Sequence, residues 1–335
     1  MKSLFLMISI VLCLSCFAQD RHRIVFYNVE NLFDTHDEIG KNDEDFTPRG
    51  IKHWNAARYN NKLLSLARAL RIAGGDTYPL VIGMAEVENR RVLSDLICKT
   101  SLSSINYSIV HKESPDFRGI DVALLYNTSY FTLIDSAFYT VPLSKTTTTR
   151  DILYAKGVLF NTDTVNFFVC HFPSRRGGSK KSAWKRKKAA SILRSHIDSL
   201  RNKNAKIIIM GDLNCNIESE ELLPLGMIDS RNLDKEGLYD TSEWLSNKSY
   251  GTYKYKDYWE VIDHIIVSSS LLRKLKEDKS TSFYLSNKMK VCMNKYLLSS
   301  DLVHFGKYPT PTYRGRLYKG GPSDHLPVYL DLFIK

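Results

Sequence analysis

The amino-acid sequence predicts a layered α/β fold from two observations. Short apolar runs rich in β-branched residues recur along the chain, and many are apolar at both alternating positions, as strands covered on two faces are. Segments with apolar residues at helical spacing lie between some of these runs. The chain has 335 residues, of which 43% are hydrophobic and 25% charged, which suits one large α/β domain or two smaller ones.

The predicted elements follow the chain in order. The expected strands are the runs 23–28, 80–86, 106–111, 120–126, 153–160, 164–170, 206–210, 261–267 and 328–333. The expected helices are 57–72 and 182–202, and the first carries Leu63, Leu66, Ala67 and Leu70 at helical spacing. Many strands with interspersed helices indicate a layered α/β domain.

The first residues predict an export signal. Lys2 forms a short positive region, Leu4 to Leu14 an apolar region, and Cys16-Phe17-Ala18 a small-x-small cleavage site. The apolar run is too short for a membrane span. We therefore expect a signal peptide over residues 1–19 and a secreted or periplasmic mature domain over 20–335, without stable membrane insertion.

The cysteines add two negative expectations. A lipoprotein anchor at Cys16 is not expected, because Cys13 stands where such a signal usually has Leu. The cysteines of the mature chain are widely spaced and contain no CxxC pair, which argues against a zinc knuckle or a redox motif. They are Cys98, Cys170, Cys215 and Cys292.

The chain is basic, with a formal net charge of +11. Part of this charge is local, since residues 171–188, HFPSRRGGSKKSAWKRKK, contain eight Lys or Arg residues and no acid. Such a run is either the solvated face of a helix or a patch that attracts phosphates. Charge alone does not decide between the two.

Acids, amides and histidines cluster at the ends of the predicted strands, where ligands meet α/β sheets. They are Asn28, Glu30, Glu86, Glu88, His171, Asp212, Asn214, Asp263, His264, Asp324 and His325. Each has an ordinary structural explanation when taken singly, such as a turn or a satisfied core histidine. Several carboxylates at buried strand ends need charge compensation, however, and oxygen ligands without a Cys cluster favour Mg²⁺ or Mn²⁺ over zinc.

The motifs NVENLF, AEVEN, CHFPS, GDLN, the Asp of IDHIIVS and SDHLPV occur in the order seen in the endonuclease/exonuclease/phosphatase superfamily. The chain resembles that superfamily, which has the fold of deoxyribonuclease I, from about Ile24 to Leu332, as a secreted member of bacterial type. The resemblance implies a four-layer sandwich, in which two mixed β-sheets pack face to face with helices outside.

The resemblance also implies roles for the residues at the strand ends. Glu86 matches a metal-binding glutamate, Asp324 a second metal-site carboxylate, and Asn28 the asparagine that positions Glu86 and the phosphate. His171 matches a residue that contacts a phosphate oxygen. Asp212 and Asn214 match the pair that orients the attacking water and the phosphoryl oxygens. His325 and Asp263 match an acid–base dyad.

Three points stay open at this level. Either Asp212 or the His325–Asp263 dyad takes the proton from the attacking water. Strand alternation would point Glu88 to the same side as Glu86, so either could be the ligand, although the AEV motif favours Glu86. Arg118 either supports substrate binding or pairs with Asp121, whereas alternation points His264 away from the site.

The resemblance implies a hydrolase of phosphate esters, and the basic run favours a polynucleotide. We expect an exported, monomeric, Mg²⁺-dependent (or Mn²⁺-dependent) endonuclease that acts on DNA more readily than RNA through backbone contacts. The candidate substrate-binding residues are Arg118, Arg175, Arg176, Lys180 and Lys181. The aromatic and basic stretch 250–259 would suit base stacking. The alternative is a phosphatase, or a phosphodiesterase acting on phospholipids or inositol phosphates.

Overall fold

The structure is a computed structural model that describes residues 21–144, 149–200, 205–233, 235–246, 248–272 and 282–334. The predicted signal peptide over residues 1–19, including Cys16, lies outside the described residues. Export of the protein therefore stays a prediction.

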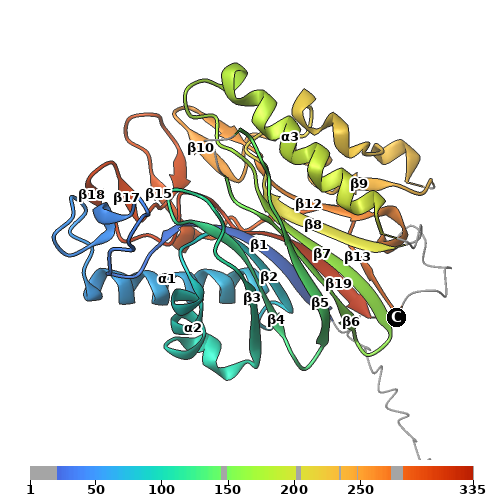
Figure 1. Ribbon diagram of the computed structural model, residues 1–335, viewed down its shortest axis with the longest axis horizontal. Helices are drawn as coiled ribbons and strands as arrows, with labels where there is room; N and C mark the ends of the chain where they lie inside the picture. The colour runs from blue at the N-terminus through green and yellow to red at the C-terminus, as the bar shows by residue number, and fades with distance from the viewer. Residues whose placement is uncertain are drawn as a thin grey trace, which may run out of the picture.

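Two mixed β-sheets form the centre of the protein (Figure 1). The first has the order β13 (Phe283–Leu285), β19 (Val328–Ile334), β1 (Arg21–Leu32), β2 (Val81–Val87), β4 (Asp121–Asn127) and β3 (Tyr107–His111), and β14 (Lys290–Val291) pairs with β19. The second has the order β5 (Phe131–Tyr139), β6 (Ile152–Leu159), β7 (Asp163–His171), β8 (Lys206–Asp212), β12 (Asp263–Ser268) and β9 (Leu238–Asp240).

Helices cover the outer face of each sheet (Figure 1). The α-helices are α1 (Ala56–Gly74), α2 (Arg90–Cys98) and α3 (Ser179–Asp198). The 3₁₀ helices are η1 (Glu44–Phe46), η2 (Ser101–Ser104), η3 (Glu220–Leu225), η4 (Ser230–Asn232), η5 (Glu243–Leu245), η6 (Ser269–Leu271) and η8 (Lys295–Leu297). Helices α1 and α2 pack on the first sheet, and α3 packs on the second together with η3.

Three hydrophobic clusters separate the four layers. The central cluster joins the two sheets, with Phe26 of β1 on one side and Phe167 and Met210 of β7 and β8 on the other. Alternate residues of the same strands point outward to the helices, as Val25 does toward α1 and Phe168 toward α3. Because these strands are covered on both faces, their sequences are nearly continuous apolar runs. The four-layer α/β sandwich is thus confirmed.

Each of the two sheets contains a parallel strand pair whose strands are joined by a helical crossover. β1 and β2 are parallel and joined through α1, and β7 and β8 are parallel and joined through α3. A parallel connection needs such a crossover, whereas the antiparallel neighbours can be joined by short loops. These two crossover units bring the carboxyl ends of β1, β2, β7 and β8 to the edges where polar residues follow.

Smaller hairpins extend from the sandwich. They are β10 (Tyr253–Tyr255) with β11 (Tyr258–Glu260), β15 (Leu298–Ser300) with β16 (Lys307–Pro309), and β17 (Tyr313–Arg314) with β18 (Leu317–Tyr318). Within the described ranges, no helix combines the length and apolar character that a membrane crossing needs. The described cysteines are all unpaired, with Cys98 exposed and Cys170, Cys215 and Cys292 buried.

Candidate active site

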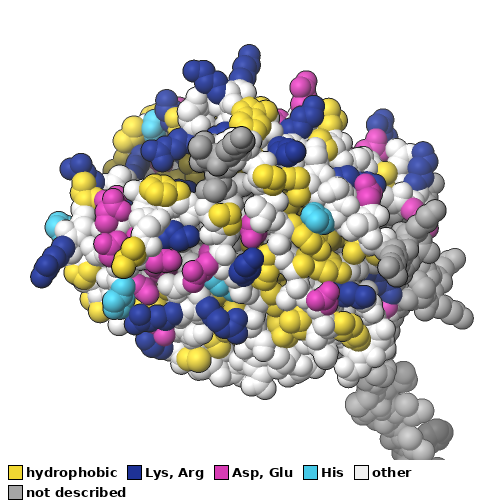
Figure 2. All heavy atoms as spheres, viewed as in Figure 1, with side chains coloured by type: hydrophobic (Ala, Val, Ile, Leu, Met, Phe, Trp, Pro, Cys, Tyr) yellow, Lys and Arg dark blue, Asp and Glu magenta, His cyan; other side chains and the backbone are white. Residues whose placement is uncertain are grey.

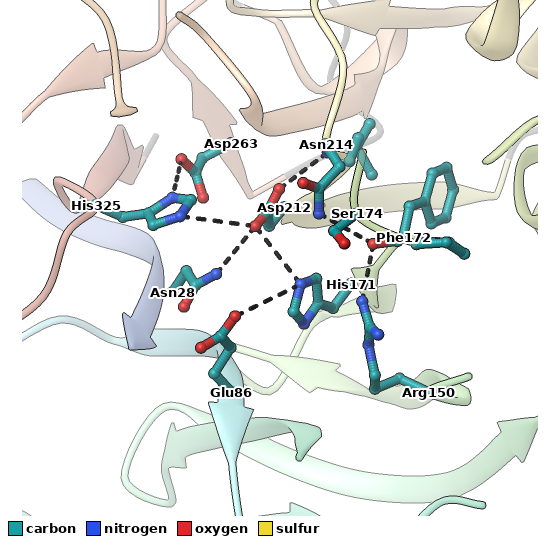
Figure 3. Close-up of polar contacts among 12 residues, drawn as sticks. Asn28, Glu86, Arg150, His171, Phe172, Ser174, Asp212, Asn214, Asp263 and His325 are labelled. Carbon is teal, nitrogen blue, oxygen red and sulfur yellow. Dashed lines mark hydrogen bonds and ion pairs between the residues drawn. The ribbon is translucent and has the colours of Figure 1, made fainter. Parts of the chain in front are cut away.

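The strand register brings residues far apart in sequence into one row. His171 on β7 is paired with Asp212 on β8, and Asp212 is paired with Asp263 on β12. Residues opposite one another on neighbouring strands point to the same face. Asn28 of β1 and His325, which precedes β19, approach this row from the facing sheet (Figure 3).

Asp212 is the centre of the resulting contacts (Figure 3). Its Oδ2 accepts a hydrogen bond of 2.9 Å from Asn28 Nδ2, and its Oδ1 accepts one of 2.9 Å from the backbone N–H of Asn214. The Nε2 atoms of His171 and His325 lie 3.6 Å and 3.8 Å from Oδ2. The carboxylate is only 2% exposed, so both oxygens are held in fixed directions.

His325 and Asp263 form the predicted pair. His325 Nδ1 lies 2.8 Å from Asp263 Oδ2, and this contact leaves Nε2 directed toward Asp212. The Ser323 hydroxyl donates to the carbonyl of Asn28 at 2.7 Å and accepts from the His325 backbone N–H. The Tyr253 ring lies against the His325 ring at a centroid distance of 4.9 Å. The imidazole is therefore fixed on several sides.

A break in the ladder separates Glu86 from Glu88. The pairing of β2 with β4 shifts between Ala85 and Val87, and the intervening Glu86 has a φ of 65°. Glu86 faces the site, where Oε1 is 3.9 Å from His171 Nε2 and Oε2 accepts from the Asn31 backbone N–H at 3.0 Å. Glu88 instead accepts from the Asp34 backbone N–H at 2.6 Å. The expectation from simple alternation, that both carboxylates point the same way, is wrong.

The buried charges shift one another's protonation. Burial first, and then the charge of Asp263, raises the pKa of Asp212 to about 7. Burial would lower the pKa of His325, but Asp263 and Asp212 outweigh it and raise that pKa well above its usual value. Burial, followed by the charges of Arg150 and Arg118, lowers the pKa of His171 well below its usual value. One histidine is thus favoured as a cation and the other as a neutral ring.

A second group of buried charges lies around Asp324. Burial, together with the charge of Glu86, raises the pKa of Asp324. Lys62 of α1 is 1% exposed, and its ammonium donates to the carbonyls of Glu30 and Pro322 and to Thr312. The Glu30 carboxylate accepts from the backbone N–H groups of Thr312 and Tyr313 at 2.6 Å and 3.1 Å. This network holds the end of β1 and the Pro322–Asp324 turn together.

Two sets of residues could hold a metal ion. Asp212, Asp263 and His325 offer ligand atoms within 4.8 Å of one another, but the His325–Asp263 hydrogen bond already pairs two of them. Glu86 and Asp324 are the better candidates, because burial and the charge of Glu86 both raise the pKa of Asp324, and a cation would relieve that repulsion. An all-oxygen set of this kind suits a hard divalent cation.

The predicted basic residues fall into two groups. Arg118 faces the site, where Nη2 donates to Asn31 Oδ1 at 2.8 Å and lies 3.9 Å from Glu86 Oε2, so it does not pair with Asp121. Arg175 donates to the Asn214 carbonyl at 2.8 Å and pairs with Glu260 at 2.5 Å. The structure thus brings both arginines next to residues of the predicted site.

The remaining basic residues lie on or beside α3. Arg176, Lys180 and Lys181 are exposed, and Figure 2 shows Lys and Arg side chains at the top of the molecule as well as over the rest of this face. Arg186 differs from the rest of the basic run, because it is fully buried and pairs with Glu221 at 2.7 Å. It belongs to the core of the helix layer and is unavailable to a phosphate.

Sequence reasoning missed Arg150 and Asp116. Arg150 is 7% exposed, and its guanidinium binds both Asp116 and the Phe172 carbonyl beside His171 (Figure 3). Neither residue belongs to a recognisable motif, and the strand that follows Arg150 offers no polar pattern that would draw attention to it. His264, in contrast, is structural as predicted, since its ring contacts Asp240 and the Cys215 carbonyl.

The four-layer sandwich and its carboxylate–histidine site define the class of protein, a hydrolase of phosphate esters. Residues 23–333 match the Endonuclease/Exonuclease/phosphatase family, and the chain belongs to that family. Its members are hydrolases that act on phosphoester bonds with the help of a divalent metal ion. No curated protein matches the chain.

Solved structures support the same fold. One is an endonuclease/exonuclease/phosphatase family protein from Bacteroides thetaiotaomicron, with 18% identity, 95% of this chain and 99% of that chain covered, and a TM-score of 0.56. A mannosyl-6-phosphatase from Bacteroides thetaiotaomicron VPI-5482 has 18% identity, coverage of 93% and 99%, and a TM-score of 0.56. TDP2 from D. rerio, complexed with single-strand DNA product, has 15% identity, coverage of 94% and 99%, and a TM-score of 0.53. At these identities the likeness concerns the fold alone.

Proposed function

We propose that the protein is an exported, Mg²⁺-dependent endonuclease that hydrolyses the DNA backbone with little sequence preference. The observation that carries this proposal is the row His171–Asp212–Asp263, closed by His325, with Arg118 and Arg175 in contact with the neighbouring Glu86 and Asn214. Phosphate contacts from such residues supply affinity without reading bases. Export rests on residues 1–19, and an intact Met1 on protein recovered from the producing cells would contradict it.

Asp212 is the proposed group that orients the attacking water and accepts its proton. Its raised pKa, about 7, suits a general base near neutral pH. His325 is poorly suited to that role, because its raised pKa keeps the ring protonated. The imidazolium instead counters negative charge on the phosphoryl group, held in place by Asp263.

Asn214 and His171 are proposed to donate hydrogen bonds to the non-bridging phosphate oxygens. Asn214 Nδ2 is directed to the Phe172 carbonyl at 3.0 Å, which sets the position of its amide beside Asp212. A divalent cation held by Glu86 and Asp324 would add positive charge against the phosphate and its leaving oxygen. His171 and Asn214 both contact Asp212, which supports their proposed role beside the group that orients the water.

Nicking of supercoiled plasmid DNA in Mg²⁺ tests the proposal. We expect EDTA to abolish nicking, and Asp212→Asn and His325→Ala each to lower its rate by about 10²-fold or more. Asp198→Asn and His36→Ala are matched controls, because both side chains are largely exposed and lie outside the site. If the wild-type protein cleaves neither DNA nor RNA with each of the divalent metals tested, the nuclease proposal is refuted.

A second candidate is a phosphodiesterase acting on phospholipids. The tips of the β10–β11 and β15–β16 hairpins expose Tyr258 by 74%, Leu302 by 90% and Phe305 by 83%. The tyrosine would serve base stacking, whereas the aliphatic side chain is better suited to a lipid surface. Hydrolysis of phospholipid vesicles in Mg²⁺ by a protein that leaves plasmid intact would select this candidate.

A further inference from the structure

A buried ion pair joins the two sheets beside the site. Asp116 lies in the loop between β3 and β4 of the first sheet, and Arg150 lies two residues before β6 of the second. Arg150 Nη1 is 3.2 Å from Asp116 Oδ2, and the two residues are 7% and 6% exposed. Such a pair adds little net stability, because desolvation offsets the attraction between its charges. Its position therefore calls for another explanation.

Each partner makes a second contact to a residue at the site. Asp116 Oδ1 accepts from the backbone N–H of Arg118 at 2.9 Å, which fixes the turn that carries Arg118 toward Asn31. Arg150 Nη2 donates to the Phe172 carbonyl at 2.8 Å (Figure 3). The same carbonyl accepts from Asn214 Nδ2, so it is shared between the two donors.

We propose that the Asp116–Arg150 pair is a positioning link that sets Arg118 and Asn214 relative to each other across the two sheets. One chain of contacts runs from Arg118 through Asp116 and Arg150 to the Phe172 carbonyl and Asn214. The planar guanidinium is suited to this task, because it presents donors in a fixed fork to two acceptors at once. Neither linking residue touches the reacting atoms.

This link rests on the hydrolase activity of the site and goes beyond it. Arg118 approaches from the first sheet and Asn214 from the second, so nothing within one sheet fixes the distance between them. A shift of about 1 Å between groups that bind one phosphate can cost about 10²-fold in rate. Removing one partner also leaves the other charge buried and unpaired, which destabilises the fold, so rates are compared per folded protein.

Hydrolysis of bis(p-nitrophenyl) phosphate tests the link with a substrate that does not depend on DNA binding. We expect Arg150→Met and Asp116→Asn each to lower kcat/KM by roughly 10- to 100-fold. Arg150→Lys should restore little of it, since one ammonium cannot copy the guanidinium fork. Arg23→Met is the matched control, because it removes a part-buried arginine–aspartate pair with Asp331 at the start of β1, away from the site.

The decisive readout is coupling to Arg118. Arg118→Ala should lower kcat/KM of the wild type. The same substitution in the Arg150→Met background should cause a fold-loss that is at least about fivefold smaller. Equal factors in both backgrounds, with losses that follow only the folded fraction, would overturn the link. If Arg150→Met does not fold, the isosteric Asp116→Asn supplies the same comparison. Activity on this ester without plasmid nicking would refute the nuclease proposal and leave the link standing.

Discussion

At the scale of single residues, the site depends on backbone conformations that few residues adopt. Glu86 has a φ of 65° and Asn214 one of 53°, both in the left-handed region. A glutamate held there costs free energy, on the order of 1 kcal/mol, which the surrounding contacts must offset. The gain is direction, because the extra residue at Glu86 turns its carboxylate toward His171 and sends Glu88 elsewhere.

This geometry separates two glutamates that the sequence leaves close to equivalent. In the proposed enzyme, Glu86→Gln should raise the Mg²⁺ concentration for half-maximal activity by about tenfold or more, because it removes a charged ligand. Glu88→Gln is the matched control and should leave that concentration unchanged. A titration of plasmid nicking against Mg²⁺ for both variants measures this, and a larger shift for Glu88→Gln would exchange their roles.

Most of the candidate site could be predicted from the sequence, because each candidate side chain belongs to a short motif at a strand end. Asn28, His171, Asp212, Asp263 and His325 all meet as expected. Arg150 and the Glu86 bulge escape such reasoning for physical reasons. Arg150 belongs to no sequence motif, and its partner Asp116 becomes evident only in the folded structure. A β-bulge inserts one extra residue into a strand, and the regular alternation of side chains used for prediction does not reveal it.

At the scale of elements, predictability follows burial. The nine expected strands and both expected helices are present, because each is covered by another layer and carries an apolar period. β5 was missed, since it is an edge strand whose residues are largely exposed or half-buried and whose sequence, FTLIDSAFY, is mixed. α2 is absent from the expected helices although Val92, Leu93, Leu96 and Ile97 recur at helical spacing, since its nine residues fall short of the roughly ten to twelve that distinguish a helix from a short apolar run.

β19 shows how an element can depend on pH. Asp331 is 3% exposed and binds Arg23 of β1 at 2.9 Å and Lys290 of β14 at 2.8 Å. Burial alone would raise the pKa of Asp331, but the hydrogen bonds from Lys290 and Arg23 outweigh it and lower that pKa. The carboxylate therefore stabilises the fold above its unfolded-state pKa, and this contribution is lost as pH falls through the folded-state pKa.

Asp331→Asn should lower the free energy of unfolding at pH 7 by about 1–3 kcal/mol, since it weakens two charge-assisted hydrogen bonds. The difference from wild type should shrink as pH falls below about 4, where the wild-type carboxylate also becomes neutral. Urea unfolding at several pH values measures both effects. A difference that stays constant down to pH 2 would assign the loss to packing. Asp198→Asn, on the exposed end of α3, is the control.

At the scale of the whole molecule, some basic side chains are buried and paired within the protein, whereas others are exposed to solvent. The net charge is +11, yet Arg186, Arg150 and Lys62 are buried and bound to groups of the protein itself. Within the basic run of residues 171–188, Lys180 and Lys181 at the start of α3 are exposed and can meet a polyanion. The count of basic residues in the sequence therefore overstates the surface that could bind DNA.

Salt dependence can measure how many of these charges meet phosphate. Each lysine that neutralises a backbone phosphate contributes about one unit to the slope of log affinity against log salt. Lys181→Gln should therefore weaken DNA binding and reduce this slope by about one, and Lys180→Gln/Lys181→Gln by about two. Lys235→Gln makes the same change of charge and should leave the slope unchanged. Lys235 lies beside Ser269, just past the end of β12, whereas Asp263 lies at the start of that strand. Equal slopes for Lys181→Gln and wild type would show that the basic run is a solvated helix face that does not contact phosphate. Equal reductions of the slope for Lys181→Gln and Lys235→Gln would indicate a general effect of net charge.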